Sequence, residues 1–164
     1  MSEAENTAEN AAKIWKAAES IRTAMLVTRG AEGLTARPMS AIVRGDESTI
    51  WFLTDAQSGK IADIEAHPQV SVTFCDGAST HVAFRGNATV HTDRATVDML
   101  WSKPALAFYP DGPGDPNIRV LRIRPEHAEL WNGPGTLVAM IKIATAAITK
   151  KGVRDMGEHI QAEI

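Results

Sequence analysis

The 164-residue sequence has a single cysteine, Cys75, and no long apolar run. One cysteine excludes a disulfide within the chain, and this low usage is typical of proteins in a reducing cytosol. The longest apolar candidate, residues 136–149, is interrupted by Lys142 and is too short to cross a bilayer. The start of the sequence, MSEAENTAEN, is acidic and lacks the apolar core of a signal peptide. We therefore predict a cytoplasmic protein without a membrane segment.

Excess positive charge is also absent. The chain has 17 basic and 20 acidic side chains, for a net charge of -3, and the basic residues are scattered. This distribution argues against a nucleic-acid partner. The five histidines show no metal-binding spacing, so we predict no metal site. The sequence contains no GxSxG motif of a serine hydrolase, and Cys75 in an alternating strand is expected to be a small core residue.

The sequence does have a series of short segments in which apolar and polar residues alternate, and these segments follow one another as the strands of β-hairpins do. With 164 residues, of which 44% are apolar, it can bury the core of one domain spanning residues 1–164. The expected strands are 24–29, 34–44, 49–54, 70–75, 81–91, 117–124, 128–131 and 159–164. The expected helices are 7–21, 59–66, 93–103 and 136–150, with residues 1–6 disordered. Because no βαβ repeat occurs, we predict a mainly β fold, a small antiparallel barrel with helical insertions.

The stretch from Arg37 to Lys60 carries the strongest functional signal. Pro38 cannot donate to a strand ladder, so the sheet is expected to have an edge, a bulge or an opening beside Arg37. Lys60 lies at a predicted helix start, after Thr54 at a strand end and Ser58 at the helix cap. A cation on a strand, a helix N-terminus and two hydroxyls together favour a phosphate site.

Two solvated surface cations remain the alternative explanation of this stretch. Flat rings attached to a phosphate would lie across the backbone of Met39 and of residues 51–53, and their burial would be favourable. The loop DGPGDP at residues 111–116 is not a phosphate loop, because it carries two aspartates and does not lead from a strand into a helix. It is expected to be a surface or lid loop.

Four segments, in their order along the chain, resemble the pyridoxamine 5'-phosphate oxidase-like, FMN-binding split-barrel proteins, and among these the bacterial general stress proteins. They are TARPMSAIV, IWFLTDAQSGKIADIEAHPQVSVTF, FRGNATVHTDR and FYPDGPGDPNIRVLRIRPEHAELWNGPG. The resemblance covers residues 13–131 and, more loosely, the C-terminal helix. It implies a split β-barrel homodimer with FMN bound at the subunit interface.

The resemblance also implies which residues bind the cofactor. Arg37 and Lys60 match the phosphate-binding cations, and two hydroxyl residues match donors to the same phosphate. Met39 and Ser40 would lie along the flavin ring or the ribityl chain, and the backbone of Leu53 would meet the flavin. The full set implied by the resemblance is Arg37, Met39, Ser40, Leu53, Thr54, Ser58, Lys60 and Trp131.

Two positions have more than one interpretation. Trp131 resembles a family tryptophan that lies near the cofactor and reaches it across the dimer, but a packing residue at the barrel end is an equal alternative. His81 stands where the oxidases carry a glutamine that contacts FMN, so we assign it no role.

The end of the sequence differs from that of the true oxidases. They carry an arginine–histidine segment that grips the substrate, whereas this sequence ends in GEHIQAEI. Oxidation of pyridoxamine phosphate is therefore not implied. Some family members bind a deazaflavin or haem, but Asp55 and the acidic turn at residues 46–47 do not suit a deazaflavin with a polyglutamate tail.

These observations favour an FMN-dependent oxidoreductase with an unknown substrate and an unknown small-molecule redox partner. No residue is assigned as an acid or a base. One alternative is a flavin store or stress sensor that acts through a partner without turnover. Another is a barrel without a cofactor that serves as an interaction module.

Overall fold

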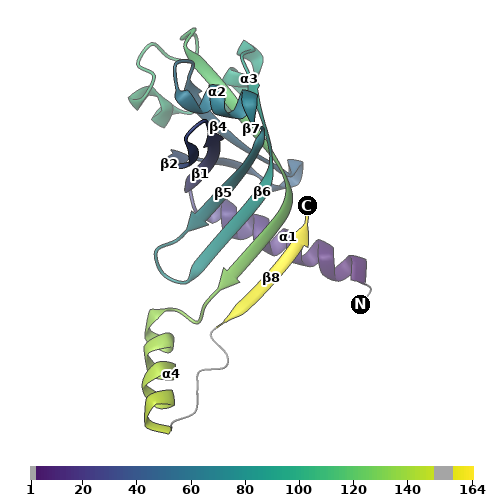
Figure 1. The fold of residues 1–164 in the computed structure, drawn as a ribbon, viewed down its shortest axis with the longest axis vertical. Coiled ribbons are helices and arrows are strands. Elements are labelled where there is room, and N and C mark those ends of the chain that lie inside the picture. The colour runs from purple at the N-terminus through teal and green to yellow at the C-terminus, as the bar shows by residue number, and fades with distance from the viewer. Residues whose placement is uncertain (1–2, 150–156) are drawn as a thin grey trace.

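The computed structural model describes residues 3–149 and 157–164. In this part of the chain, eight antiparallel strands form one curled sheet (Figure 1). The strands are β1 (Thr23–Gly30), β2 (Gly33–Ser40), β3 (Ile42–Arg44), β4 (Thr49–Asp55), β5 (Gln69–Cys75), β6 (Thr80–His91), β7 (Ile118–Asn132) and β8 (Glu158–Glu163). Their order is β2-β1-β5-β6-β7-β4-β3, and β8 pairs with β7. The predicted mainly β split barrel with helical insertions is confirmed.

The described residues also form four α-helices and two 3-10 turns. They are α1 (Glu3–Ser20), α2 (Gly59–Ala66), α3 (Arg94–Leu100), α4 (Thr136–Thr149), η1 (Gly45–Glu47) and η2 (Lys103–Ala107). Helices α2 and α3 lie at one end of the barrel, and α4 projects from the other end (Figure 1). None of the described helices is long and apolar enough to span a membrane.

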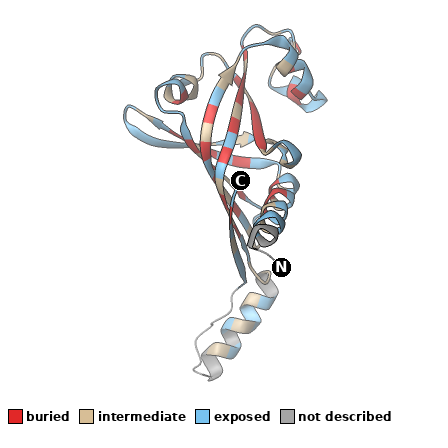
Figure 2. Cartoon of the chain, turned by 90° about the vertical axis from the view of Figure 1, so that its right-hand side faces the viewer, coloured by how far each residue is buried: buried red, intermediate tan, exposed pale blue. Residues whose placement is uncertain are grey.

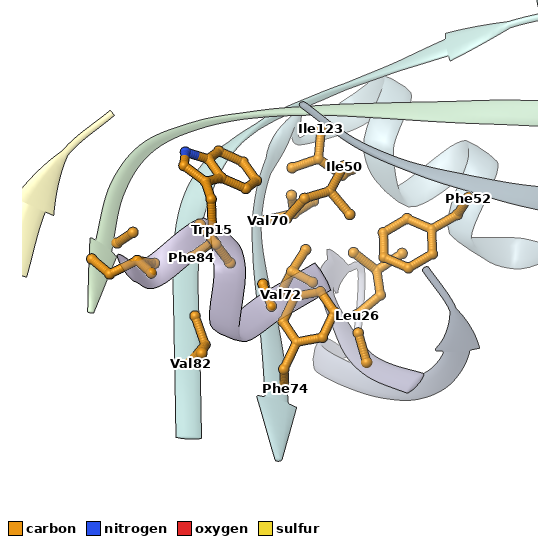
Figure 3. Packing of buried hydrophobic residues seen from close by; sticks show 14 of the residues in the cluster. Trp15, Leu26, Ile50, Phe52, Val70, Val72, Phe74, Val82, Phe84 and Ile123 are labelled. Carbon is orange, nitrogen blue, oxygen red and sulfur yellow. The ribbon is translucent and has the colours of Figure 1, made fainter. Parts of the chain in front are cut away.

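The main hydrophobic core fills the space between α1 and the inner face of the sheet. Buried and exposed residues alternate along the long strands, as expected for strands with one face on a core (Figure 2). Trp15 of α1 reaches into this core and packs on Phe84, with ring centroids 4.8 Å apart (Figure 3). One face of the first helix is therefore a packing surface.

Several predicted boundaries were wrong. Helix α1 begins at Glu3 rather than Thr7, so residues 3–6, which we expected to be disordered, are helical. Residues 1–2 and residue 150, the predicted end of the last helix, lie outside the described residues. Helix α3 ends at Leu100 rather than residue 103, because the chain turns extended at Trp101 and then starts the separate turn η2, which has Pro104 in its first residues.

Cys75 was predicted to be buried but is exposed. It ends β5, and the burial pattern of this strand places every second residue, Cys75 included, on the outer face. Alternation identified the strand but assigned the cysteine to the wrong face.

The two strands predicted around Pro125 are one strand, β7, of 15 residues. The ladder between β6 and β7 shifts register at Arg85 and Gly86, so Pro125 pairs with Gly86 and Glu126 is skipped. A Cβ on Gly86 would lie 2.1 Å from the carbonyl oxygen of Arg124. Gly86 thus lies at a bulge, which lets a proline lie inside a long strand.

The barrel is open between β2 and β3. These strands are the two ends of the sheet order, although only Ala41 separates them in the sequence. Pro38 lies in β2, an edge strand, where a missing N–H is tolerated. The sheet therefore opens beside Arg37, as the proline indicated.

Candidate functional site

A pocket of about 420 Å³ lies at this opening of the barrel. Its walls come from β2, β4, the start of α2 and the segment 102–109. Six of the eight residues predicted to bind a cofactor line it, namely Arg37, Met39, Ser40, Leu53, Thr54 and Lys60. Residues from Arg37 to Lys60 are thus gathered around one cavity.

Lys60 is anchored by the two hydroxyl residues named with it. Its Nζ donates to Thr54 Oγ1 at 2.9 Å and also to Ser58 Oγ. Ser58 occupies the cap position of α2, but its side chain makes no capping hydrogen bond. Because both hydroxyls accept from the ammonium group, each keeps its own hydrogen to donate to a ligand. This group of donors suits an anion.

The electrostatics at Lys60 also favour a bound anion. Burial lowers the pKa of the Lys60 ammonium, and the positive charge of Arg37 lowers it further, while Asp55 raises it. Two cations therefore lie close enough to repel each other inside a partly enclosed pocket. An anion between them would relieve this repulsion.

Two polar residues, Thr28 and Asp63, hold the Arg37 guanidinium in place. Its Nη1 donates to Thr28 Oγ1 at 2.7 Å, and its Nη2 lies 3.3 Å from Asp63 Oδ2. Thr28 is fully buried and donates to the same Asp63 oxygen at 2.9 Å. Gly30 leaves room for this carboxylate, since a Cβ there would lie 2.7 Å from Asp63 Oδ1. The guanidinium has five donor hydrogens, so others remain for a ligand.

Sequence reasoning missed Thr28 and Asp63. Leu26 pairs with Arg37 across the β1–β2 hairpin, and Thr28, two residues from Leu26, is therefore the diagonal neighbour of Arg37. Asp63 follows Lys60 by three residues and therefore lies on the same face of α2. Hairpin register and helical spacing would have found both residues.

The rest of the pocket is mainly apolar. Its lining residues from the segment 102–109 are Ser102, Pro104, Ala105, Phe108 and Tyr109, none of which was predicted. Phe108 is 73% exposed although it borders the pocket. Burial raises the pKa of the Tyr109 phenol, with further contributions from Asp55 and Asp115, so the phenol keeps its proton. A cationic end and an apolar surface thus meet in one cavity.

Trp131 does not line this pocket. It borders a second pocket together with His81 and His159, and none of these residues lines the pocket at the barrel opening. The reach of Trp131 to a cofactor across a dimer stays a prediction.

Comparison with known proteins identifies the family. Residues 9–154 match the family described as pyridoxamine 5'-phosphate oxidase like. The chain belongs to this family.

Three relatives show how far the family likeness extends. General stress protein 26 of Bacillus subtilis (strain 168) is 31% identical over 91 residues, which are 53% of this chain and 64% of that protein. The chain thus spans less than two thirds of that curated relative. The structure of a general stress FMN/FAD binding protein of Xanthomonas citri is 38% identical, covering 77% of this chain and 90% of its own, with a TM-score of 0.68.

The third relative is a candidate general stress protein 26 of Jannaschia sp. CCS1. Its structure is 27% identical to this chain and covers 96% of it and 99% of its own length, with a TM-score of 0.74. The predicted resemblance to the general stress proteins of this family is confirmed.

Proposed function

We propose that this chain binds FMN in the pocket at the barrel opening and acts as a flavin-dependent oxidoreductase of the general stress protein group. The observation that carries the proposal is the convergence of Lys60 and Arg37, with hydroxyl donors, at one end of a mainly apolar cavity. The Xanthomonas citri relative, an FMN/FAD binding protein, supports a flavin. A single cationic end favours FMN, which has one phosphate, over FAD.

Different residues would bind different parts of this ligand. Lys60 and Arg37 would bind the phosphate, with Thr54 and Ser58 as hydroxyl donors, and each charged hydrogen bond contributes about 1.5–3 kcal/mol. The flavin ring would lie beside Met39 and the other apolar lining residues. When bound, flavin supplies hydride and electron transfer. The protein's part is to bind and orient it and to exclude water.

We further propose that the protein is a homodimer with FMN at the interface. The pocket has an exposed aromatic rim at Phe108, and α4 exposes Met140, Ile141 and Ile143. Exposed apolar surface of this kind favours association with a second copy. Since Trp131 lies outside the pocket of its own chain, its contact with FMN would come from the partner subunit.

The experiment that tests the cofactor site is the double substitution of Arg37→Ala and Lys60→Ala. Loss of two charged hydrogen bonds, at about 1.5 kcal/mol each, weakens FMN binding about a hundredfold or more. The matched control replaces the exposed cations Lys16 and Arg124 by alanine, which changes net charge equally. The purified double variant is expected to be free of flavin and folded, and the control to be flavin-bound. Full flavin retention by the double variant would show that the phosphate assignment is wrong.

A second candidate function is a flavin store or sensor without turnover. The titratable side chains lining the described pocket are Arg37, Lys60 and Tyr109. No histidine, aspartate or glutamate lines it, and these side chains are the usual general bases, so the lining favours a site without proton-transfer chemistry. Stopped-flow reduction by nicotinamide donors separates the two functions, since an enzyme shows rapid, saturable reduction and a store only slow bimolecular reduction.

A further inference from the structure

The loop of residues 109–116, YPDGPGDP, is attached next to the cationic end of the barrel-opening pocket. Directly after the loop, the carbonyl oxygen of Asn117 accepts a hydrogen bond from the N–H of Ala56 at 2.7 Å. In the sequence, Ala56 lies between the two hydroxyl residues that accept from Lys60. The loop therefore lies beside the turn that carries the predicted phosphate donors.

Two arginines fix the course of this loop through its carbonyl groups. Arg94, the first residue of α3, donates from Nη1 to the carbonyl oxygens of Pro113 and Asp115, each at 2.9 Å. Arg119 of β7 donates from Nη1 to the carbonyl oxygen of Pro116 at 2.8 Å. Because these donors are charged, a change in the course of the loop would break several strong hydrogen bonds. The residues that the loop presents to the pocket are therefore held in place.

Tyr109 is the residue of this loop that lines the pocket. Its ring packs against the hydrophobic cluster that contains Val97 and Leu100 of α3. It also contacts the Trp101 ring, with ring centroids 6.4 Å apart. Among the residues that the structure describes, the Tyr109 hydroxyl has no hydrogen-bond partner. A phenol that is fixed by its ring thus borders the cavity with its donor hydrogen unused.

One carboxylate acts on both the Tyr109 phenol and the Lys60 ammonium. Burial raises the pKa of the phenol, and the negative charges of Asp55 and Asp115 add to this shift. Burial and the charge of Arg37 lower the pKa of the ammonium, whereas Asp55 opposes that shift. Because such charge effects fall off with distance, the phenol and the ammonium lie at the same end of the pocket.

We propose that Tyr109 determines ligand specificity at this pocket, because its phenol donates a hydrogen bond to a terminal phosphate that Lys60 and Arg37 hold. Arg94 is then a positioning residue, since it fixes the loop that carries the phenol. A terminal phosphate offers three strong acceptor oxygens. The phenol therefore favours FMN over riboflavin, which has the same ring and ribityl chain without the phosphate. This inference rests on the proposed function, since it takes the phosphate to be that of FMN.

The first test compares FMN with riboflavin by fluorescence titration of the flavin-free full chain. We expect Tyr109→Phe to weaken FMN binding about tenfold, through loss of a hydrogen bond to a charged group, and to change riboflavin affinity by less than about twofold. Phe108→Leu is the matched control, since Phe108 also lines the pocket but has no hydroxyl. It should change both affinities by the same factor. Equal changes for FMN and riboflavin in Tyr109→Phe would overturn the proposal.

A second test examines whether Arg94 acts through Tyr109. Arg94→Ala is expected to weaken FMN binding severalfold without weakening riboflavin binding. Arg94→Lys should weaken it less, because an ammonium still donates to a loop carbonyl. In a Tyr109→Phe background, Arg94→Ala should cause no further loss. Arg124→Ala, which removes the same charge from an exposed site, is the control. Additive losses would overturn the positioning role.

A spectroscopic test reports on the phenol itself. The chain has a single tyrosine, so labelling tyrosine Cζ with carbon-13 gives one NMR signal. The Cζ signal of a phenol moves toward the phenolate position when the phenol donates to an anion. We expect this displacement with FMN and not with riboflavin, whose ring has the same effect on neighbouring nuclei. The same spectrum with both ligands would show a phenol that bonds only to solvent, which would overturn the proposal.

Failure of the proposed function gives a different result. The unchanged protein would then bind neither flavin, and inorganic phosphate becomes the probe. A Cζ displacement that phosphate causes in the unchanged protein, but not in Lys60→Ala with an equal urea unfolding midpoint, would support the phenol as a donor at a phosphate site without flavin. No displacement with phosphate would overturn the inference together with the proposed function.

Discussion

At the scale of single residues, Lys60 connects the fold to the proposed ligand through one ammonium group. Two hydroxyl oxygens fix its position, and burial together with Arg37 lowers its pKa. A bound phosphate would favour the protonated form and raise this pKa again. The affinity for FMN is therefore linked to the protonation of Lys60.

We predict that FMN affinity falls as the pH rises through the lowered pKa of Lys60 toward the ordinary lysine value of 10.5. Below that window the lysine is charged in the free and bound protein, so affinity is at its maximum. Within it, binding requires uptake of a proton, and affinity falls up to about tenfold per pH unit. Fluorescence titration of FMN above pH 7 measures this, because the phosphate itself takes up a proton only near pH 6.

Lys60→Arg is the control for this pH dependence. A guanidinium stays charged throughout the range, so the affinity of this variant should be level where that of the unchanged protein falls. The same alkaline decline in both proteins would assign the effect to another group.

A second prediction at this scale concerns Asp63. Asp63→Asn removes the charge that holds Arg37 and is expected to weaken FMN binding about tenfold through misplacement of the guanidinium. In an Arg37→Ala background the same substitution should have almost no effect on FMN affinity, because there is no longer a guanidinium to position. Isothermal titration of the four proteins measures the coupling, and additive effects would contradict a positioning role.

The residues that contact the pocket from β2, β4 and α2 were predictable because local signals mark them. A proline marks the strand opening beside Arg37, and a strand end followed by a helix start marks Thr54 and Lys60. Phe108 and Tyr109 carry no such signal, since their loop reaches the pocket only through the fold. Whether Trp131 contacts a cofactor depends on a second chain, which single-chain periodicity does not describe.

At the scale of elements, the bulge between β6 and β7 lies where the long strand β7 changes from one pairing partner to another. The first part of β7 pairs with β4, and the part beyond Pro125 pairs with β8 along the same edge. Gly86 lies opposite Pro125 at the point of change. The sequence pattern predicted two strands here because a proline usually ends a strand. Only the pairing of Pro125 with Gly86 shows that the strand continues through the proline.

We predict that Gly86→Ala destabilises the protein by roughly 1–3 kcal/mol, because a methyl group would strike the backbone of the opposite strand. Gly114→Ala is the matched control, since no atom lies within 4 Å of its added Cβ. It should change the free energy of unfolding by no more than about 0.5 kcal/mol. Urea unfolding measures both, and equal stability of the two variants would contradict the close approach at the bulge.

At the scale of the whole molecule, the barrel is open between its two edge strands and carries the candidate site there. The expected homodimer would cover this side of the pocket. We predict a mass in solution of about twice the 17.7 kDa of one chain, measured by light scattering after size exclusion.

Phe108→Asp tests whether the pocket rim is part of that dimer. The side chain is 73% exposed, so the substitution should leave the barrel folded while shifting the mass toward the monomer and weakening FMN binding. Leu34→Asp is the control, because Leu34 is equally exposed at 76% but does not line the pocket. A monomer in the unchanged protein, or a dimer unaffected by Phe108→Asp, would contradict this arrangement.

The central claim is that the pocket at the barrel opening binds FMN, and the absorption spectrum of the purified protein tests it most directly. We predict flavin bands in the visible range, and heat release of a ligand whose fluorescence and chromatographic mobility are those of FMN. A featureless spectrum that titration with FMN does not change would contradict the claim and would favour a barrel that serves as an interaction module.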